Sequence, residues 1–250
     1  MLIPSFYIGW DVGGWNCDNN ANSRDALVIL DADLGIIGKP WRGNLRAIIN
    51  EASSGPEWIQ KLFALCNSTS PNQARYTLAI DTPLGFSDAF VGLITQQQHL
   101  EKLGRSGSNS YLYRRTEQCL FERGLKPLSA IKDMIGSQAT KGMHVLAKFA
   151  IQAIRCGVWS DDNQIVAIEA YPSSCKNSAS VTALQKPYGK LGHEDIDDAL
   201  TCALIAFLFD TRNETLLPPL ACATMSEGWI WVPNDGLPDD MRKKHHEHLE

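Results

Sequence analysis

Three short apolar segments of this chain each carry an acidic residue at or near their end, where folding itself does not require one. The segments read FYIGWD, YTLAID and QIVAIEAYP, and their acids are Asp11, Asp81 and Glu169. Apolar runs of this length, bounded by Gly or Pro, predict buried β-strands. A carboxylate beside a core needs a partner or a cation. The three positions therefore constrain both the sheet and the chemistry at its edge.

Two further acids open the most strongly apolar helix that the sequence predicts. The segment HEDIDDALTCALIAFLF predicts a helix over residues 194–209. Asp195 and Asp198 are three positions apart in its first turn, so we expect their side chains on one face, where the helix dipole favours negative charge. Taken singly, each Asp of the chain is explained as well by a cap or a turn. Taken together, the acids favour one shared site, with Asp197 facing elsewhere.

The order of the predicted elements favours an α/β fold. Three strands joined by short links predict an antiparallel meander, and the later strands alternate with helices, which predicts a mixed sheet covered on both faces. The five strands are predicted at residues 6–11, 26–30, 35–38, 75–80 and 164–170. A short closing strand is expected at residues 228–232, and a helical insertion at about residues 87–157. This order fits a ribonuclease-H-like fold with a mixed five-stranded sheet flanked by helices.

We expect one domain over residues 1–248, because no linker or low-complexity segment divides the chain. The last two residues, 249–250, are consistent with a cloning scar, so the nearby C-terminal His cluster carries no weight as a metal site.

The acids predict a site for Mg²⁺ or Mn²⁺. Hard cations prefer oxygen ligands, and Mg²⁺ keeps several waters while a few carboxylates hold it. The ligands expected are Asp11, Asp81, Glu169 and Asp198, with Asp195 supporting them. Zinc is disfavoured because no Cys or His group has suitable spacing. Two such ions could activate water and stabilise a leaving oxygen, so the chemistry expected is phosphodiester hydrolysis. His193, beside the helix start, is a candidate to orient a carboxylate.

Charge and cysteine content narrow the class of protein. The formal net charge is −5, yet residues 101–155 hold ten Lys or Arg against four Asp or Glu. That basic region predicts a phosphate-facing surface, with Arg114, Arg115 and Lys148 as candidates to hold substrate phosphates, whereas the overall charge disfavours strong unspecific duplex binding. Seven scattered Cys without a CxxC pair predict reduced thiols and a cytoplasmic location. No apolar run is long enough for a membrane helix, and the start does not resemble a signal peptide.

Six motifs together resemble a family of uncharacterised predicted nucleases, the domain-of-unknown-function family numbered 429. They are GWDVGGW, AIDTPLGF, YRRTEQC, VAIEAYP, DIDDALTCA and EGWIWVP, and they span residues 9–233. The resemblance implies a ribonuclease-H-like nuclease with core acids Asp11, Asp81, Glu169 and Asp198. It also implies that Lys148 and Lys186 neutralise a substrate phosphate. The family's Arg-Cys-Asp pattern is replaced here by Arg115-Thr116-Glu117.

Three alternatives stay open at this point. DVGGW is close to the first phosphate loop of the sugar-kinase and actin fold, which would make the protein a nucleotide-binding phosphotransferase. The Trp and Tyr residues could stack on bases in a non-catalytic nucleic-acid-binding or scaffolding protein. An enzyme acting on a small phosphorylated or nucleotide-like molecule is the third. Aromatic-rich surfaces also permit a homodimer.

Overall fold

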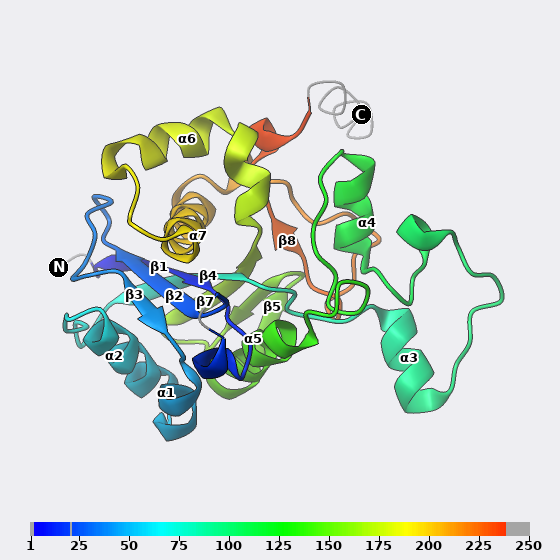
Figure 1. Cartoon of the computed structure of the whole chain (residues 1–250), viewed down its shortest axis with the longest axis horizontal. Coiled ribbons are helices and arrows are strands. Elements are labelled where there is room, and N and C mark those ends of the chain that lie inside the picture. The colour runs from blue at the N-terminus through cyan, green and yellow to red at the C-terminus, as the bar shows by residue number, and fades with distance from the viewer. Residues whose placement is uncertain (1–2, 21, 239–250) are drawn as a thin grey trace.

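The computed structural model describes residues 3–20 and 22–238, and its centre is one mixed β-sheet (Figure 1). The strands are β1 (Ser5–Asp11), β2 (Asp25–Leu30), β3 (Trp41–Gly43), β4 (Arg75–Asp81), β5 (Gln152–Arg155), β6 (Val158–Ser160), β7 (Ile165–Ala170) and β8 (Ile230–Trp231). Their order is β3-β2-β1-β4-β7-β6-β5, and β8 pairs with the end of β7. The core strands β1, β4 and β7 are parallel, whereas β2, β3, β5 and β6 pair antiparallel.

Helices cover both faces of the sheet, as Figure 1 shows. One face carries α6 (Ala179–Gln185) and α7 (Glu194–Thr211), and the other carries α1 (Arg46–Glu51), α2 (Gly55–Leu65) and α5 (Gly136–Phe149). To one side lie α3 (Asp88–Gln96) and α4 (Arg115–Glu122). The protein is therefore an α/β protein. No helix of the described residues is long and apolar enough to cross a membrane.

Side chains alternate between the two faces along the central strands, as the strand period of two requires. On β1, Tyr7 belongs to the core beneath α7, whereas Ile8 and Trp10 belong to the core beneath α2 and α5. On β4, Ala79 belongs to the core beneath α7 and Ile80 to the core beneath α2 and α5. The alternation therefore places the last residue of each strand on the α7 face.

Gly9 allows α7 to pack directly against β1. A Cβ at this position would lie 1.8 Å from the carbonyl oxygen of Ala199 and 2.4 Å from the backbone nitrogen of Ala203. Only a residue without a side chain permits this approach of helix backbone to strand. The contact fixes the first turns of α7 over the ends of the strands.

Replacement of Gly9 by Ala should destabilise the protein by about 3 kcal/mol, the upper end of the usual cost of overpacking, because backbone atoms cannot rotate away. Chemical denaturation measures the loss. Gly136→Ala is the matched control, because its added Cβ would meet nothing closer than 4.0 Å. Equal stability of the two variants would contradict the close packing of α7 on β1.

The structure corrects the predicted sheet in three places. Eight strands are present in the described residues instead of five. The third strand lies at β3, and residues 35–38 contribute only a bridge between Leu30 and Ile36. The helical insertion expected up to about residue 157 ends earlier, because α5 ends at Phe149 and the chain continues into the β5–β6 hairpin. The hairpin escaped prediction because β5 is a fully exposed edge strand without apolar alternation.

Two of the predicted elements are confirmed. The helix expected from residue 194 is α7, and the closing strand is β8. Ser87 caps α3 by accepting a hydrogen bond from the backbone of Phe90. All seven cysteines are free, and five of them are buried. The predictions for residues 249–250 and for the C-terminal His cluster lie outside the described residues.

Candidate functional site: an acidic cavity at the strand ends

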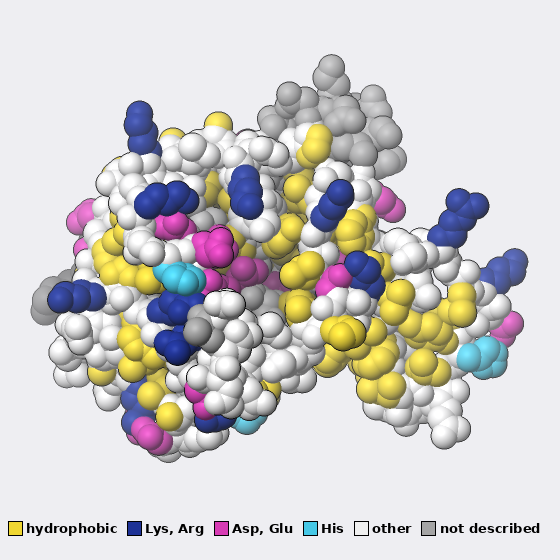
Figure 2. Space-filling model, in the orientation of Figure 1, with side chains coloured by type: hydrophobic (Ala, Val, Ile, Leu, Met, Phe, Trp, Pro, Cys, Tyr) yellow, Lys and Arg dark blue, Asp and Glu magenta, His cyan; other side chains and the backbone are white. Residues whose placement is uncertain are grey.

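A cavity of about 480 Å³ lies at the carboxyl ends of β1, β4 and β7, beneath the start of α7. Figure 2 shows acidic side chains gathered in a recess in this part of the surface. In mixed α/β sheets, ligands bind at such strand ends because the sheet holds the loop-borne groups rigidly. The cavity is lined by six acidic residues, namely the five predicted site acids and Glu194: Asp11, Asp81, Glu169, Glu194, Asp195 and Asp198.

Asp11 and Asp81 form the floor of the cavity. They are paired residues on the neighbouring parallel strands β1 and β4, so their side chains lie on the same face of the sheet. Burial raises the pKa of Asp11 well above its ordinary value, and the charges of Asp81, Asp195 and Asp198 raise it further. Burial, followed by the charges of Asp198 and Glu169, raises the pKa of Asp81 to about 8. Two carboxylates are thus held together, and neither has an ion pair or side-chain hydrogen bond with another described residue.

Asp198 reaches the same cavity from the first turns of α7. Burial is the largest influence on its pKa and raises it, and the neighbouring acids of the helix add to the effect. Lys176 acts in the opposite direction. The direct packing of α7 on Gly9 brings this carboxylate to the strand ends, because Asp198 immediately precedes the contact residue Ala199.

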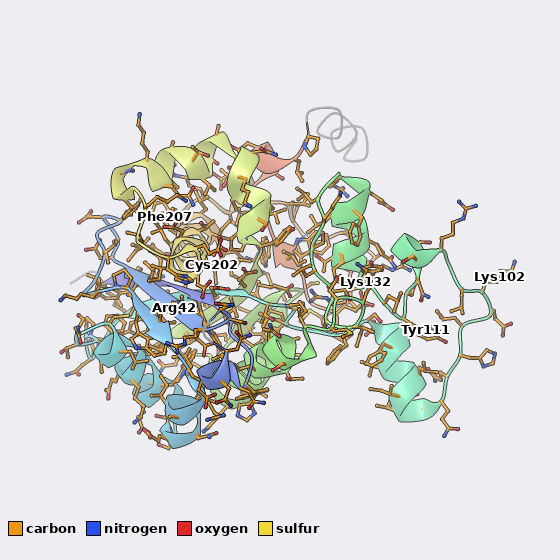
Figure 3. The ribbon with its side chains drawn as sticks, in the orientation of Figure 1. Arg42, Lys102, Tyr111, Lys132, Cys202 and Phe207 are labelled. Carbon is orange, nitrogen blue, oxygen red and sulfur yellow. The ribbon has the colours of Figure 1, made fainter. Side chains whose placement is uncertain are left out.

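Asp195 and Asp197 have different environments on the same helix. Asp195 accepts a hydrogen bond of 2.7 Å from Nε of Arg42, which ties α7 to β3; Figure 3 labels Arg42 beneath the helix. Asp197 turns away, as predicted, and accepts hydrogen bonds from the backbone of Leu191 and from Lys190. His193 caps the helix, since its Nδ1 accepts a hydrogen bond from the backbone of Asp195.

Glu169 borders the cavity, but its carboxylate belongs to the opposite face of the sheet. Its partner on β4 is Ile80, not Asp81, and Ile80 packs in the core beneath α2 and α5. Both oxygens of Glu169 accept hydrogen bonds from Arg114, at 2.8 and 2.6 Å, and one also accepts from the backbone of Leu84. Glu169 thus lies near enough to add to the rise in the pKa of Asp81, while both of its oxygens are engaged by Arg114; its role as a fourth metal ligand stays a prediction.

Arg114 is a buried ion-pair residue and does not face the cavity. Its side chain is 2% exposed. Besides the two bonds to Glu169, it donates from Nε to Glu117 at 2.9 Å and from Nη1 to the carbonyl oxygen of Glu227 at 3.1 Å. Since these acceptors engage the guanidinium group on all sides, the geometry differs from the substrate-binding role predicted for Arg114.

The other predicted phosphate-binding residues also lie outside the acidic cavity. Arg115 has a side-chain hydrogen bond to Gln118 on the surface of α4. Lys148 donates to the backbone oxygens of Ile49 and Asn50, beside α1. Lys186 lies in a separate groove. The basic region of the sequence therefore does not converge on the acids.

Two cavity residues were missed from the sequence. Thr82, which directly follows Asp81, is 4% exposed, and its hydroxyl has no hydrogen-bond partner among the described residues. Arg24 also lines the cavity, and its buried Nε likewise lacks a partner within the described part of the chain. Arg24 precedes β2, which runs antiparallel to β1, and this pairing returns it to the ends of the strands. Both residues line the cavity, so a ligand bound there could satisfy their unpartnered polar atoms.

A buried ion pair supports the loop that follows Asp11. Lys141 of α5 donates to Asp25, and neither side chain is exposed to solvent. Asp25 also accepts from Nε1 of Trp10 and from the backbone of Gly13 and Leu45. The sequence indicates that Asp25 is buried, because this acid begins the apolar run DALVIL.

The donor set fits a hydrated divalent cation more closely than a closed metal cage. No group of three or more His, Cys, Asp or Glu side chains in residues 3–20 and 22–238 is arranged to hold a metal ion. Mg²⁺ is usually bound through one or two carboxylates, with waters and substrate oxygens completing its shell. Asp11 and Asp81, with Asp198 opposite them, supply that kind of oxygen site and the negative charge it needs.

Comparisons of this chain with protein-family models, with curated proteins and with solved structures find no match.

Proposed function

We propose that this protein is a Mg²⁺- or Mn²⁺-dependent phosphodiesterase whose substrate is a nucleic acid or a nucleotide-like diester. The observation that carries the proposal is the grouping of Asp11, Asp81 and Asp198 on one cavity, where burial and mutual repulsion raise the pKa of each. Clustered perturbed carboxylates in a cleft are typical of functional sites. A bound cation would remove the repulsion, and Thr82 adds an unpartnered hydroxyl at the same place.

The arrangement of the sheet supports a ribonuclease-H-like fold for the protein. An antiparallel meander, β1 to β3, is followed by two strands parallel to β1, in the spatial order β3-β2-β1-β4-β7. The acids sit at the carboxyl ends of the first and fourth strands and on the last long helix. The resemblance to the predicted-nuclease family, which six sequence motifs carry, is part of the same proposal.

The residues of the cavity have separate tasks in this proposal. One or two of the carboxylates of Asp11, Asp81 and Asp198 would hold the cation directly, and waters and substrate oxygens would complete its shell. When bound, the ion supplies Lewis-acid chemistry, activating water and stabilising charge on the leaving oxygen. Arg24 would neutralise a substrate phosphate oxygen, and the hydroxyl of Thr82 would donate to an oxygen of the substrate or of a bound water. Asp195, paired with Arg42, would fix the first turn of α7.

The phosphotransferase alternative loses its main support. A phosphate loop needs free backbone N–H groups. In the Gly13–Trp15 segment, the N–H of Gly13 donates to Asp25 and that of Trp15 donates to Ser137. The loop is thus built to dock on α5. A scaffolding protein, for its part, would gain no stability from unneutralised acids.

Conversion of both Asp11 and Asp198 to Asn should abolish saturable Mn²⁺ binding and lower Mn²⁺-dependent hydrolysis of bis-para-nitrophenyl phosphate by about 1,000-fold. Charge stabilisation by a catalytic ion is worth several kcal/mol, and about 1.4 kcal/mol corresponds to a factor of ten in rate. Calorimetric titration and absorbance assays measure the two effects.

Asp197→Asn is the matched control, because Asp197 adjoins Asp198 in sequence but faces away and keeps an oxygen to accept from Leu191. It should bind Mn²⁺ and hydrolyse the diester as the wild type does. Wild-type protein that neither binds Mn²⁺ nor cleaves the diester would contradict the proposed function.

A further inference from the structure

A second hollow adjoins the acidic cavity on the other side of the first turns of α7. It is a groove of about 710 Å³, bounded by α6, by the loop that leads into α7 and by the helical turn at Pro172–Asn177. Three lysines line it: Lys176, Lys186 and Lys190. Figure 2 shows Lys and Arg side chains over α6, above the recess that holds the acids. The acidic cavity is thus bordered by a basic groove.

The two hollows meet at consecutive residues of α7. Asp197 lines the groove and Asp198 lines the cavity. Lys176 lies close enough to Asp198 to act against the rise that burial causes in the pKa of Asp198. A ligand longer than a single phosphate group could therefore contact a cation held by the acids and, at the same time, the lysines of the groove.

Two of the three lysines are available to a ligand. Lys190 is paired with Asp197 at 3.2 Å. Lys176 and Lys186 are exposed and make no ion pair within the described part of the chain. Unpaired lysines gathered along a groove provide the charge that follows a phosphate backbone.

The dimensions of the acidic cavity limit what can reach its floor. Its volume is that of a site for one small molecule, and loop residues including Thr82, Pro127 and Tyr171 surround it. Asp11 and Asp81 are only partly exposed. A base-paired duplex presents its phosphates on a broad outer surface and cannot enter a hollow of this size, whereas one nucleotide of an unpaired strand can.

We propose that the groove of Lys176 and Lys186 binds backbone phosphates of an unpaired polynucleotide strand, one nucleotide of which occupies the acidic cavity. This inference rests on the proposed phosphodiesterase function and adds its substrate class, single-stranded DNA or RNA. The strand crosses the first turns of α7, with a nucleotide on the Asp198 side and the neighbouring phosphates on the Asp197 side.

The test measures binding by fluorescence anisotropy with Ca²⁺ in place of Mg²⁺ or Mn²⁺, so that the acids hold a cation while the strand is not cleaved. The probes are fluorescein-labelled oligothymidylate, oligouridylate and a blunt duplex of the same length. Lys176→Ala/Lys186→Ala should bind both single strands at least tenfold more weakly than wild type. The slope of log affinity against log salt should fall by about 1.4, since each single-strand phosphate contact contributes about 0.7.

The matched control is Lys39→Ala/Lys102→Ala, which removes the same charge from exposed sites outside both hollows; Figure 3 places Lys102 at the outer end of the projecting segment after α3. The control should bind as wild type does. Unchanged single-strand binding by the Lys176/Lys186 variant, or equal wild-type affinity for the duplex, would overturn the inference. Failure of the wild type to cleave bis-para-nitrophenyl phosphate with Mn²⁺ would instead count against the proposed function, so the two failures are seen in separate assays.

Discussion

Asp81→Asn should raise the melting temperature of the protein while lowering its Mn²⁺-dependent diester hydrolysis by about 1,000-fold. Asp81 is held among Asp11, Asp198 and Glu169 by the ends of the strands, and its ionised form is opposed by burial first and by Asp198 and Glu169 next. Asn has nearly the same shape and no charge, so the substitution removes this cost. It also removes an oxygen ligand that the proposed chemistry needs, because an amide neutralises no cation.

The gain in stability should depend on pH in a defined direction. The folded-state pKa of Asp81 is raised from 3.8 to about 8, so between these values the folded state binds a proton that the unfolded state has released. The free energy of unfolding of the wild type therefore falls as the pH rises from 3.8 to about 8. Above pH 8 the carboxyl is ionised in both states, and the folded state bears the full destabilisation by its charge. A full shift of this size would exceed 5 kcal/mol, but partial exposure to solvent reduces it. We expect about 2 kcal/mol, or about 4–8 °C for a chain of this length.

Differential scanning fluorimetry at about pH 5 and about pH 8, in EDTA, measures the effect. The difference between Asp81→Asn and wild type should be small at the lower pH and largest at the higher one. Asp33→Asn, which alters an exposed acid outside the cavity, should shift neither value. Added Mn²⁺ should raise the melting temperature of wild type more than that of Asp81→Asn. If Asp81→Asn melted at or below the wild-type temperature at pH 8, the charge of Asp81 would not destabilise the folded protein.

The two acids on the floor of the cavity could be predicted from the sequence, because the pattern that identifies each of them lies within a few residues of it. Asp11 and Asp81 each end an apolar run, and carboxyl ends of parallel strands meet at one edge of a sheet. The start of α7 could also be predicted, from the helical spacing of the apolar residues that follow Asp195. The position of Glu169 could not be read in this way. Its segment is apolar on both faces, as a central strand should be, so the sequence contains no alternation that shows on which face Glu169 lies.

The partners of the buried charges could not be predicted because they are distant in sequence. Arg114 meets Glu169 across 55 positions, and Lys141 meets Asp25 across 116. Basic residues in the central region were therefore interpreted as a surface for phosphate, although two of them neutralise buried acids. The register of β4 on β7 determines the face on which Glu169 lies, since it pairs Glu169 with Ile80, and the side chain of Glu169 bonds to Arg114. Register depends on pairing across the sheet.

Arg114→Met should destabilise the protein by about 3–5 kcal/mol, the range found when one member of a buried ion pair is removed. Burial alone would lower the pKa of Arg114, but the carboxylates of Glu117 and Glu169 outweigh it and raise that pKa. Both of these acids are buried too, and without the guanidinium group they would be left charged or would have to take up protons. The side chain of Met keeps most of the apolar packing, so the loss measures the charges and hydrogen bonds.

Denaturant titration of three variants distinguishes the loss of the buried ion pair from the effect of replacing any arginine by methionine. Arg115→Met changes the neighbouring residue, whose exposed side chain donates a hydrogen bond to Gln118, and should cost less than about 1 kcal/mol. Arg114→Met/Glu169→Gln should recover part of the stability, because it neutralises one of the two buried carboxylates that the loss of Arg114 leaves without a partner; Glu117 is the other. Recovery would show that Glu169 is kept for its pairing with Arg114. If the double variant were no more stable than Arg114→Met, and retained no diester hydrolysis, Glu169 would have a task in the cavity beyond that pairing.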